Sequence, residues 1–476
     1  MFQVPDMQLA LPEMLMLAIS CFLLLFVAFT SNKKMEWVHR FAILGLFVTI
    51  LSIVLSWGQT GQTFSSTYIK DPLSDLLKLS ICLLNVIVLI YSYSYLKARQ
   101  LMQGEFYVLA MFATLGMMIM VSAAHFITLY LGLELMSLCL YALVAMQRDS
   151  VLATEAAMKY FILGAIASGM LLYGMSIIYG VTGSLALVDI ATYIHSSSGD
   201  ETLLSFALVF IVIAIGFKFG AVPFHMWLPD VYQGAPTAMT LFLASAPKLA
   251  AFALLIRLLG EGLIDLHGYW QQMLIAMAVL SMIIGNVVAI AQSNLKRMLA
   301  YSTISHVGFL LLGVLTGSDQ GFAASLFYIL IYTLMVLGAF GVILLLSKQG
   351  FEAEYIDDFK GLSSQHPWFA LLMLILMFSM AGIPPLAGFY AKLLVIKSVI
   401  DADLFAVAII AVMASVVGAF YYLRIIKVMF FDQAEKAITI EASLMMKVIL
   451  SLNTFLVLAL GIFPGFLMSM SSRIFL

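Results

Sequence analysis

The sequence predicts an all-α polytopic membrane protein with about fourteen transmembrane helices. Of its 476 residues, 63% are hydrophobic and only 10% are charged, and the mean hydropathy is +1.09. A typical soluble domain has about 25% charged residues, so this composition excludes that class. The apolar residues also form segments of about 20 residues, the length that crosses a bilayer. The net charge of -2 argues against nucleic acid as a partner.

The expected spans follow one another along almost the whole chain. They lie at residues 9–30, 38–57, 73–96, 105–122, 125–146, 157–180, 203–227, 236–260, 271–292, 298–316, 321–347, 368–398, 403–430 and 444–470. The fourth and fifth are separated by only a few residues. Read as one helix, they would be about 60 Å long at 1.5 Å per residue, so two spans are predicted.

Basic residues gather in every second loop, and this asymmetry orients the chain. Lys97, Arg148 and Lys296 are typical of the basic side, whereas the other side has few cations, among them Lys70 and Arg473. Cytoplasmic loops carry the excess of lysine and arginine. We therefore expect a multi-pass protein of a bacterial plasma (inner) membrane with both termini on the periplasmic side.

Two predicted spans, 203–227 and 368–398, are interrupted by proline and lie five helices apart, and each has a lysine near its break. This pattern predicts that spans four to eight and nine to thirteen repeat one five-helix unit. Because the number of helices is odd, the two repeats are inverted in the membrane. The expected parts are a three-helix segment (1–100), a first repeat (101–262), a second inverted repeat (263–432) and a C-terminal helix (433–476).

Ionisable residues inside the apolar spans are the candidate functional groups. A charge at the bilayer centre costs about 2.5–3.5 kcal/mol on insertion scales, so charges kept there predict a route for protons or ions. Lys218 lies five residues before Pro223. Glu134, in another span, is its expected partner in a movable contact. A static ion pair that fixes helix packing is the alternative.

Two further lysines extend this set. Lys248 follows Pro247 and has no acid nearby in the sequence, which favours a relay role. Lys392 follows Pro384 by eight residues and is the counterpart of Lys218 in the second repeat. Snorkelling to the interface is the alternative for Lys392, but Lys397 fits that position better.

Three residues are possible additional relays. His225 follows the first break directly, His306 lies well inside its span, and Lys159 opens another span. For His225 the alternative is a loop histidine at the water interface, and for Lys159 an interfacial position. Lys78 and Arg257 lie near helix ends, and we expect them to be anchors.

No cofactor is expected in this chain. Cys21, Cys82 and Cys139 each fall in an apolar run and are far apart in the sequence. This spacing matches neither a disulfide framework, nor an iron–sulfur cluster, nor a zinc site. The sequence also has no Walker A loop and no dinucleotide-binding fingerprint. We expect the cysteines to be small buried hydrophobic residues.

Four segments resemble the antiporter-like subunits of respiratory complex I, and among these the subunit N group. They read FKFGAVPFHMWLPDVYQGAPT, APKLAAF, NLKRMLAYSTISHVGF and AGIPPLAGFYAK. The resemblance covers essentially the whole chain. It implies that Glu134 and Lys218 form the charge pair of a first half-channel and that Lys248 is the central lysine. It implies further that Lys392 belongs to a second half-channel, and that His225 and His306 lie on the hydrated axis between them.

The resemblance also implies a function, namely that of a proton-translocating membrane-arm subunit of NADH:quinone oxidoreductase. The implied partners are subunits resembling M, K, J and A. Electrons would pass from NADH through FMN and iron–sulfur clusters in other subunits to quinone. Two alternatives stay open from the residues alone. One is a subunit of a multi-chain cation/proton antiporter without redox partners, and the other is a membrane scaffold in which the lysines form static pairs.

Overall fold

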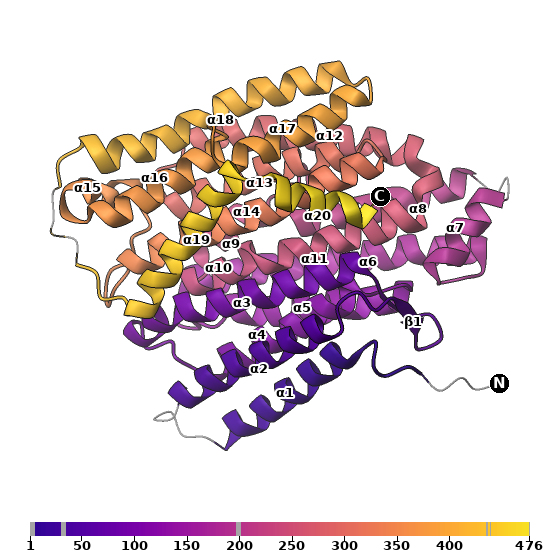
Figure 1. Cartoon of the computed structure of the whole chain (residues 1–476), viewed down its shortest axis with the longest axis horizontal. Helices are drawn as coiled ribbons and strands as arrows, with labels where there is room; N and C mark the ends of the chain where they lie inside the picture. The colour runs from indigo at the N-terminus through magenta and orange to yellow at the C-terminus, as the bar shows by residue number, and fades with distance from the viewer. Residues whose placement is uncertain (1–4, 30–34, 197–200, 435–436, 438, 476) are drawn as a thin grey trace. The chain divides into compact units, whose positions relative to one another are not determined.

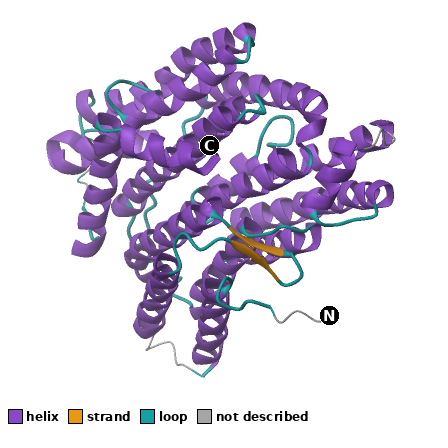
Figure 2. Ribbon diagram, turned by 45° about the vertical axis from the view of Figure 1, so that its right-hand side comes forward, coloured by secondary structure: helices purple, strands orange, loops and turns teal. Residues whose placement is uncertain are grey.

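The computed structural model is almost entirely helical (Figure 1) and describes residues 5–29, 35–196, 201–434, 437 and 439–475. By length and composition, thirteen helical segments in this part of the chain can cross a membrane. The prediction of an all-α polytopic membrane protein is confirmed. One short hairpin was not predicted. Its strands, β1 (Gly61–Thr63) and β2 (Tyr68–Lys70), pair antiparallel and are orange in Figure 2.

The helices lie close to the predicted spans. Their bounds are α1 Leu11–Ala28, α2 Met35–Leu55, α3 Pro72–Ala98, α4 Gly104–Val121, α5 Phe126–Val144, α6 Val151–Thr182, α7 Leu187–Ser196, α8 Glu201–Phe219, α9 Trp227–Gly234, α10 Thr237–Ala244, α11 Ala246–Leu255, α12 His267–Ile290, α13 Leu295–Val314, α14 Asp319–Leu346, α15 Leu362–Gln365, α16 Pro367–Ala381, α17 Ala387–Asp401, α18 Phe405–Phe431, α19 Leu444–Ile462 and α20 Gly465–Phe475. A π-helical stretch, Ile256–Gly262, continues α11.

Three predicted spans end or divide at glycine and proline. The span expected at 203–227 stops as a helix at Phe219, because Gly220 takes a left-handed backbone with φ +74°. The span expected at 368–398 is divided into α16 and α17, as its prolines predicted. The span expected at 444–470 as one helix is two helices, α19 and α20. That prediction was wrong because Pro464 removes a backbone donor and disfavours helix in the residue before it.

The chain divides into two compact units. Unit 1 comprises Met1–Leu89, Leu101–Lys218 and Ala246–Trp270, and unit 2 comprises Ile90–Gln100, Phe219–Ser245 and Gln271–Leu476. Each unit therefore takes segments from distant parts of the sequence. This division follows the packing of the chain and does not test the predicted repeat boundaries, which stay a prediction.

In unit 1, α4 and α5 approach so closely that their backbones touch. A Cβ atom added to Gly132 would lie 2.6 Å from the Met120 nitrogen, and one added to Gly116 would lie 2.6 Å from the Met136 nitrogen. Small residues allow this kind of approach between membrane helices. The contact fixes α5, the helix that carries Glu134, and α4 packs in turn on α1, α2 and α11.

Unit 2 is built around α14. This helix packs against α10, α13, α16, α17, α19 and α20. Nearly all of its residues are buried, and so are nearly all residues of α13. The polar side chains of these two helices therefore have to find partners inside the unit.

The contact between α4 and α5 gives a first prediction. Gly132→Ala places a methyl group against backbone that cannot move aside, and overpacking of this kind costs about 1–3 kcal/mol. We expect much less folded chain in membranes, measured by size-exclusion chromatography of a fluorescent fusion. Gly169→Ala, in α6, is the matched control because nothing lies within 4 Å of its added Cβ. Equal yields of the two variants would contradict the prediction.

Candidate functional site

The break after α8 is stabilised by a side chain of another helix. The turn from Gly220 to Met226 leads from α8 to α9, and a proline in it cannot donate a hydrogen bond. Within unit 2, the Val222 N–H donates to Ser281 Oγ at 2.9 Å. Interrupted backbone at membrane depth needs such partners, because lipid supplies none.

Lys218, in the last turn of α8, is buried with an exposed fraction of 9%. Its Nζ donates to Ser137 Oγ of α5 at 2.8 Å. Ser137 is one turn after Glu134, so both side chains lie on the same face of α5. The Glu134 carboxylate is within electrostatic range of the amine, but its Oε1 is buried without a hydrogen-bond partner among the described residues. The structure therefore holds the Lys218 and Glu134 side chains close together, while the amine donates its hydrogen bond to a neutral hydroxyl.

Lys248 lies in the first turn of α11, where every residue is buried. Its own exposed fraction is 2%. The helix packs on α4, the helix that also contacts α5. Lys248 is thus buried within unit 1, and its position inside the membrane and its role stay predictions.

Lys392, on α17, closes the second break. Its Nζ donates to the carbonyl of Ala381, the last residue of α16, at 2.9 Å and to Ser415 Oγ of α18 at 3.0 Å. The break frees this carbonyl from its helical partner, and a cation at a helix C-terminus is favourable. Gly382 follows with φ +85°, and a Cβ there would lie 2.9 Å from Lys392 Cδ. The glycine leaves room for the lysine to reach across.

His306 is buried on α13, deep in unit 2. Both ring nitrogens contact tyrosine hydroxyls, Tyr328 at 2.6 Å and Tyr422 at 3.0 Å. Lys392 is within electrostatic range of the imidazole. Its amine also lies 5.0 Å from the centroid of the Phe309 ring, which is on the same helix as His306. These two sequence-predicted residues are thus close neighbours.

The remaining two candidates are placed differently. His225 is half-buried in the turn between α8 and α9, where its carbonyl accepts from the Leu228 N–H at 3.0 Å. Lys159 lies on an outer face of α6, with 42% of its side chain exposed and its Nζ 2.8 Å from Glu155. An i,i+4 pair of this kind stabilises the surface of a helix, and both the relay role and the interfacial position of Lys159 stay predictions.

Some buried charges were not predicted from the sequence. Lys78 is fully buried, with its Nζ 2.7 Å from Glu13 Oε1, and it donates to the Tyr68 hydroxyl at 2.8 Å. Arg257, with an exposed fraction of 1%, pairs with Asp71 at 2.7 Å. The expectation that Lys78 and Arg257 are interfacial anchors was therefore wrong. A sequence signal did exist for the first pair, since Glu13 opens one span and Lys78 another.

One cysteine also departs from expectation. Cys82 and Cys139 are buried, but Cys21 is exposed on α1. The outer faces of α1 and α2 are rich in exposed apolar side chains such as Phe22 and Phe47. A small apolar residue is suited to such a face.

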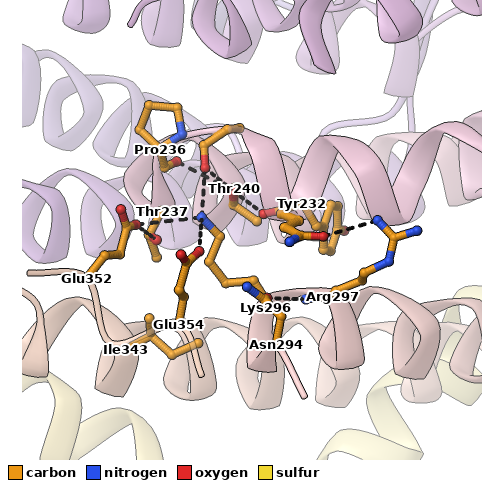
Figure 3. A network of polar contacts seen from close by, with 12 residues as sticks. Tyr232, Pro236, Thr237, Thr240, Asn294, Lys296, Arg297, Ile343, Glu352 and Glu354 are labelled. Carbon is orange, nitrogen blue, oxygen red and sulfur yellow. Dashed lines mark hydrogen bonds and ion pairs between the residues drawn. The ribbon is translucent and has the colours of Figure 1, made fainter. Parts of the chain in front are cut away.

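A network in unit 2, partly drawn in Figure 3, centres on Glu352 in the loop after α14. Its carboxylate contacts the Arg99 guanidinium and the Thr237 hydroxyl, accepts from the Tyr95 hydroxyl at 3.1 Å, and lies 3.6 Å from Lys296 Nζ. Burial alone would raise the pKa of Glu352, but Lys296 and Arg99 outweigh it and lower the pKa to about 2. Since Thr237 begins α10, the network holds the start of that helix.

Comparison with known proteins places this arrangement in a family. The family model for the transmembrane part of NADH:quinone oxidoreductases and Mrp antiporters matches residues 123–418. The chain belongs to this family. It is 54% identical over 475 residues to NADH-quinone oxidoreductase subunit N of Thioalkalivibrio sulfidiphilus, covering 99% of this chain and 98% of that protein. The corresponding protein of Thiobacillus denitrificans is 56% identical over 468 residues, covering 97% and 95%.

Solved structures agree with the family. A chain of respiratory complex I from Thermus thermophilus is 32% identical, with a TM-score of 0.84, covering 97% of this chain and 99% of that one. A chain of the Mrp complex from Dietzia sp. has a TM-score of 0.86 at 20% identity, which shows a shared fold alone. The resemblance to antiporter-like subunits of complex I, and to the subunit N group, is confirmed.

The Glu352 network gives a second prediction. A carboxyl whose pKa is lowered in the folded state stabilises that state at all pH values above its unfolded pKa of about 4.3. This contribution is lost as the pH falls towards about 2. At pH 7, Glu352→Gln should therefore lower the free energy of unfolding by a few kcal/mol, about 1.4 per unit of pKa shift.

The measurement is the thermal melting temperature of the purified protein in detergent at pH 7. Asp357→Asn is the control, because the Asp357 side chain is 76% exposed and pairs only loosely with Lys360 at 3.7 Å. A melting temperature of Glu352→Gln as high as that of the control would contradict the stabilising role of the network.

Proposed function

We propose that this chain is a proton-translocating membrane-arm subunit of an NADH:quinone oxidoreductase in a bacterial inner membrane. The observation that carries this proposal is the set of buried lysines at the helix breaks, Lys218 and Lys392, together with Lys248. Near full-length similarity to proteins named NADH-quinone oxidoreductase subunit N supports it. In membrane spans, buried ionisable groups are costly and typically mark ion or proton pathways.

In this proposal, Glu134 and Lys218 act as a switch. In this structure the Lys218 amine donates a hydrogen bond to the hydroxyl of Ser137, which lies one helical turn from Glu134. Approach to the carboxylate stabilises the ammonium form, and separation in a desolvated site favours release of the proton. A ligand or field that favours one of these arrangements shifts the population between them.

The other candidates take successive places in the route. Lys248 is the central lysine, and Lys392 serves the second half, where a carbonyl and a hydroxyl hold it. His225 and His306 would bridge proton steps between lysines. Lys159 is the weakest candidate, because 42% of its side chain is exposed and it is paired with Glu155.

The redox chemistry belongs to other subunits of the assembled complex. NAD, FMN, iron–sulfur clusters and quinone would bind there, and this chain would couple to them mechanically and electrostatically. The proposed neighbours are membrane-arm subunits resembling M, K, J and A. The basic loops would face the cytoplasm and both termini the periplasm, as the distribution of lysine and arginine predicts.

A second candidate function is a subunit of a multi-chain cation/proton antiporter without redox partners. The shared family with Mrp antiporters and the fold of the Dietzia complex favour it. However, this chain is only 20% identical to the chain of the Dietzia complex, whereas it is 54% and 56% identical to two subunit N proteins. Purification of a tagged chain separates the two functions, because flavin and iron–sulfur absorbance in the purified complex supports the first and its absence supports the second.

The third prediction tests the proposed route. We expect Lys218→Ala to leave a large complex on native gels but to reduce both NADH oxidation and proton uptake in membrane vesicles by about 100-fold or more, the lower end of the range for a lost proton-transfer group. Lys397→Ala is the control, because Lys397 is exposed on α17. An assembled Lys218→Ala complex that pumps at the rate of the control would contradict a proton route through Lys218.

A further inference from the structure

The surroundings of His306 form a continuous chain of hydrogen bonds in unit 2. Tyr328 of α14 contacts Nδ1 at 2.6 Å, and Tyr422 of α18 contacts Nε2 at 3.0 Å. The Tyr422 hydroxyl also contacts Ser302 Oγ, one turn before His306 on α13. Four side chains from three helices are thus joined, and the Tyr421 hydroxyl also bonds to Ser302 and Tyr422.

All four groups are shielded from the surface. The exposed fractions are 2% for Ser302, 4% for His306 and 1% for both Tyr328 and Tyr422. Burying hydroxyls and an imidazole is unfavourable unless they are hydrogen-bonded, and here each one is. A satisfied polar network in a core of this kind holds its members in a single arrangement.

At one end of the chain, Phe309 lies between Tyr328 and Lys392. The Tyr328 ring stacks on Phe309, with 6.4 Å between centroids and 12° between planes. The Lys392 amine lies 5.0 Å from the Phe309 centroid and within electrostatic range of His306. The aromatic ring separates the amine from the hydrogen-bonded chain at that end.

The chemistry of these groups suits proton transfer. A neutral imidazole donates from one nitrogen and accepts at the other, whereas a hydroxyl does both. Either tautomer of His306 therefore satisfies both tyrosines. Among the side chains, only histidine carries two ring nitrogens of which one donates while the other accepts.

We propose that Tyr422 and Tyr328 are the direct proton-exchange partners of His306, in a wire running Ser302–Tyr422–His306–Tyr328 to the neighbourhood of Lys392. This inference rests on the proposed function and extends it to residues outside the lysine row. In each transfer, Ser302 takes a proton from a protonated water molecule and passes its own hydroxyl proton to the Tyr422 oxygen, which gives its hydroxyl proton to Nε2. The Nδ1 proton moves to the Tyr328 oxygen, and Tyr328 passes its own hydroxyl proton to a second water molecule. One proton has then moved, and the imidazole is left in its other tautomer.

A neighbouring tyrosine provides the matched control. The Tyr332 ring packs 5.0 Å from the His306 ring, but its hydroxyl donates to Thr303 Oγ1 at 2.8 Å. Thr303 donates in turn to the Leu299 carbonyl at 2.8 Å, so this branch ends on an acceptor that carries no proton. Tyr332→Phe removes a buried hydroxyl beside the same histidine without interrupting the wire.

The test compares Tyr422→Phe, Tyr328→Phe and Tyr332→Phe in the assembled complex in vesicles. For the first two, we expect normal assembly on native gels, coupled NADH oxidation lower by about 100-fold, and a larger ratio of rates in H₂O and D₂O. Tyr332→Phe should match the wild type in all three readouts. Ser302→Ala is the smallest change at the end of the wire and should also slow coupled turnover, so it tests the wire even if a tyrosine variant assembles poorly.

Two outcomes would overturn the wire. If Tyr332→Phe falls as far as the other two, the tyrosines only hold the imidazole in place. If Tyr422→Phe, Tyr328→Phe and Ser302→Ala all turn over like the wild type while Lys392→Ala does not, the wire is wrong and the proposed function stands. Should Lys392→Ala and Lys218→Ala also be without effect, the proposed function itself fails.

Discussion

The contact between the Lys392 amine and the carbonyl of Ala381 is the interaction on which unit 2 depends. A helix that ends inside the bilayer leaves carbonyls without partners, and lipid cannot supply them. The lysine donates to one of these carbonyls at 2.9 Å, and Gly382 leaves space for it. One charged group thus satisfies the broken backbone and is itself held beside His306. The Lys392 amine is thus part of both the break between α16 and α17 and the proposed proton route. Removing the break would therefore also move the lysine.

Four buried cations show two kinds of contact. Lys78 and Arg257 pair directly with carboxylates, at 2.7 Å in each case. Removing one partner of such a pair leaves an uncompensated buried charge, so these pairs hold their helices together. Lys218 and Lys392 instead donate to hydroxyl and carbonyl oxygens. A lysine without a bound anion exchanges its proton more readily, and this difference separates a structural ion pair from a candidate relay.

Much of the fold followed from the sequence because the bilayer imposes it. Apolar length and proline positions predicted most of the long helices and the breaks after α8 and α16, but not the break between α19 and α20. Charge inside apolar segments predicted Lys218, Lys248 and Lys392. Pairing between distant segments did not follow, since an acid and a lysine at the starts of two spans, as with Glu13 and Lys78, do not show that the two side chains meet. The same holds for Glu352, which lies in a short loop and gains its role only through partners brought close by folding.

The account makes one central claim, that buried lysines at the breaks take up and release protons instead of serving as fixed charges. Lys218→Arg tests it most directly, because arginine keeps the positive charge and stays protonated at any physiological pH. Proton uptake and NADH oxidation would be measured in vesicles carrying the assembled variant complex. The account predicts that the complex forms but pumps few or no protons. Pumping at the wild-type rate would contradict it, since a permanent charge would then be sufficient at this position.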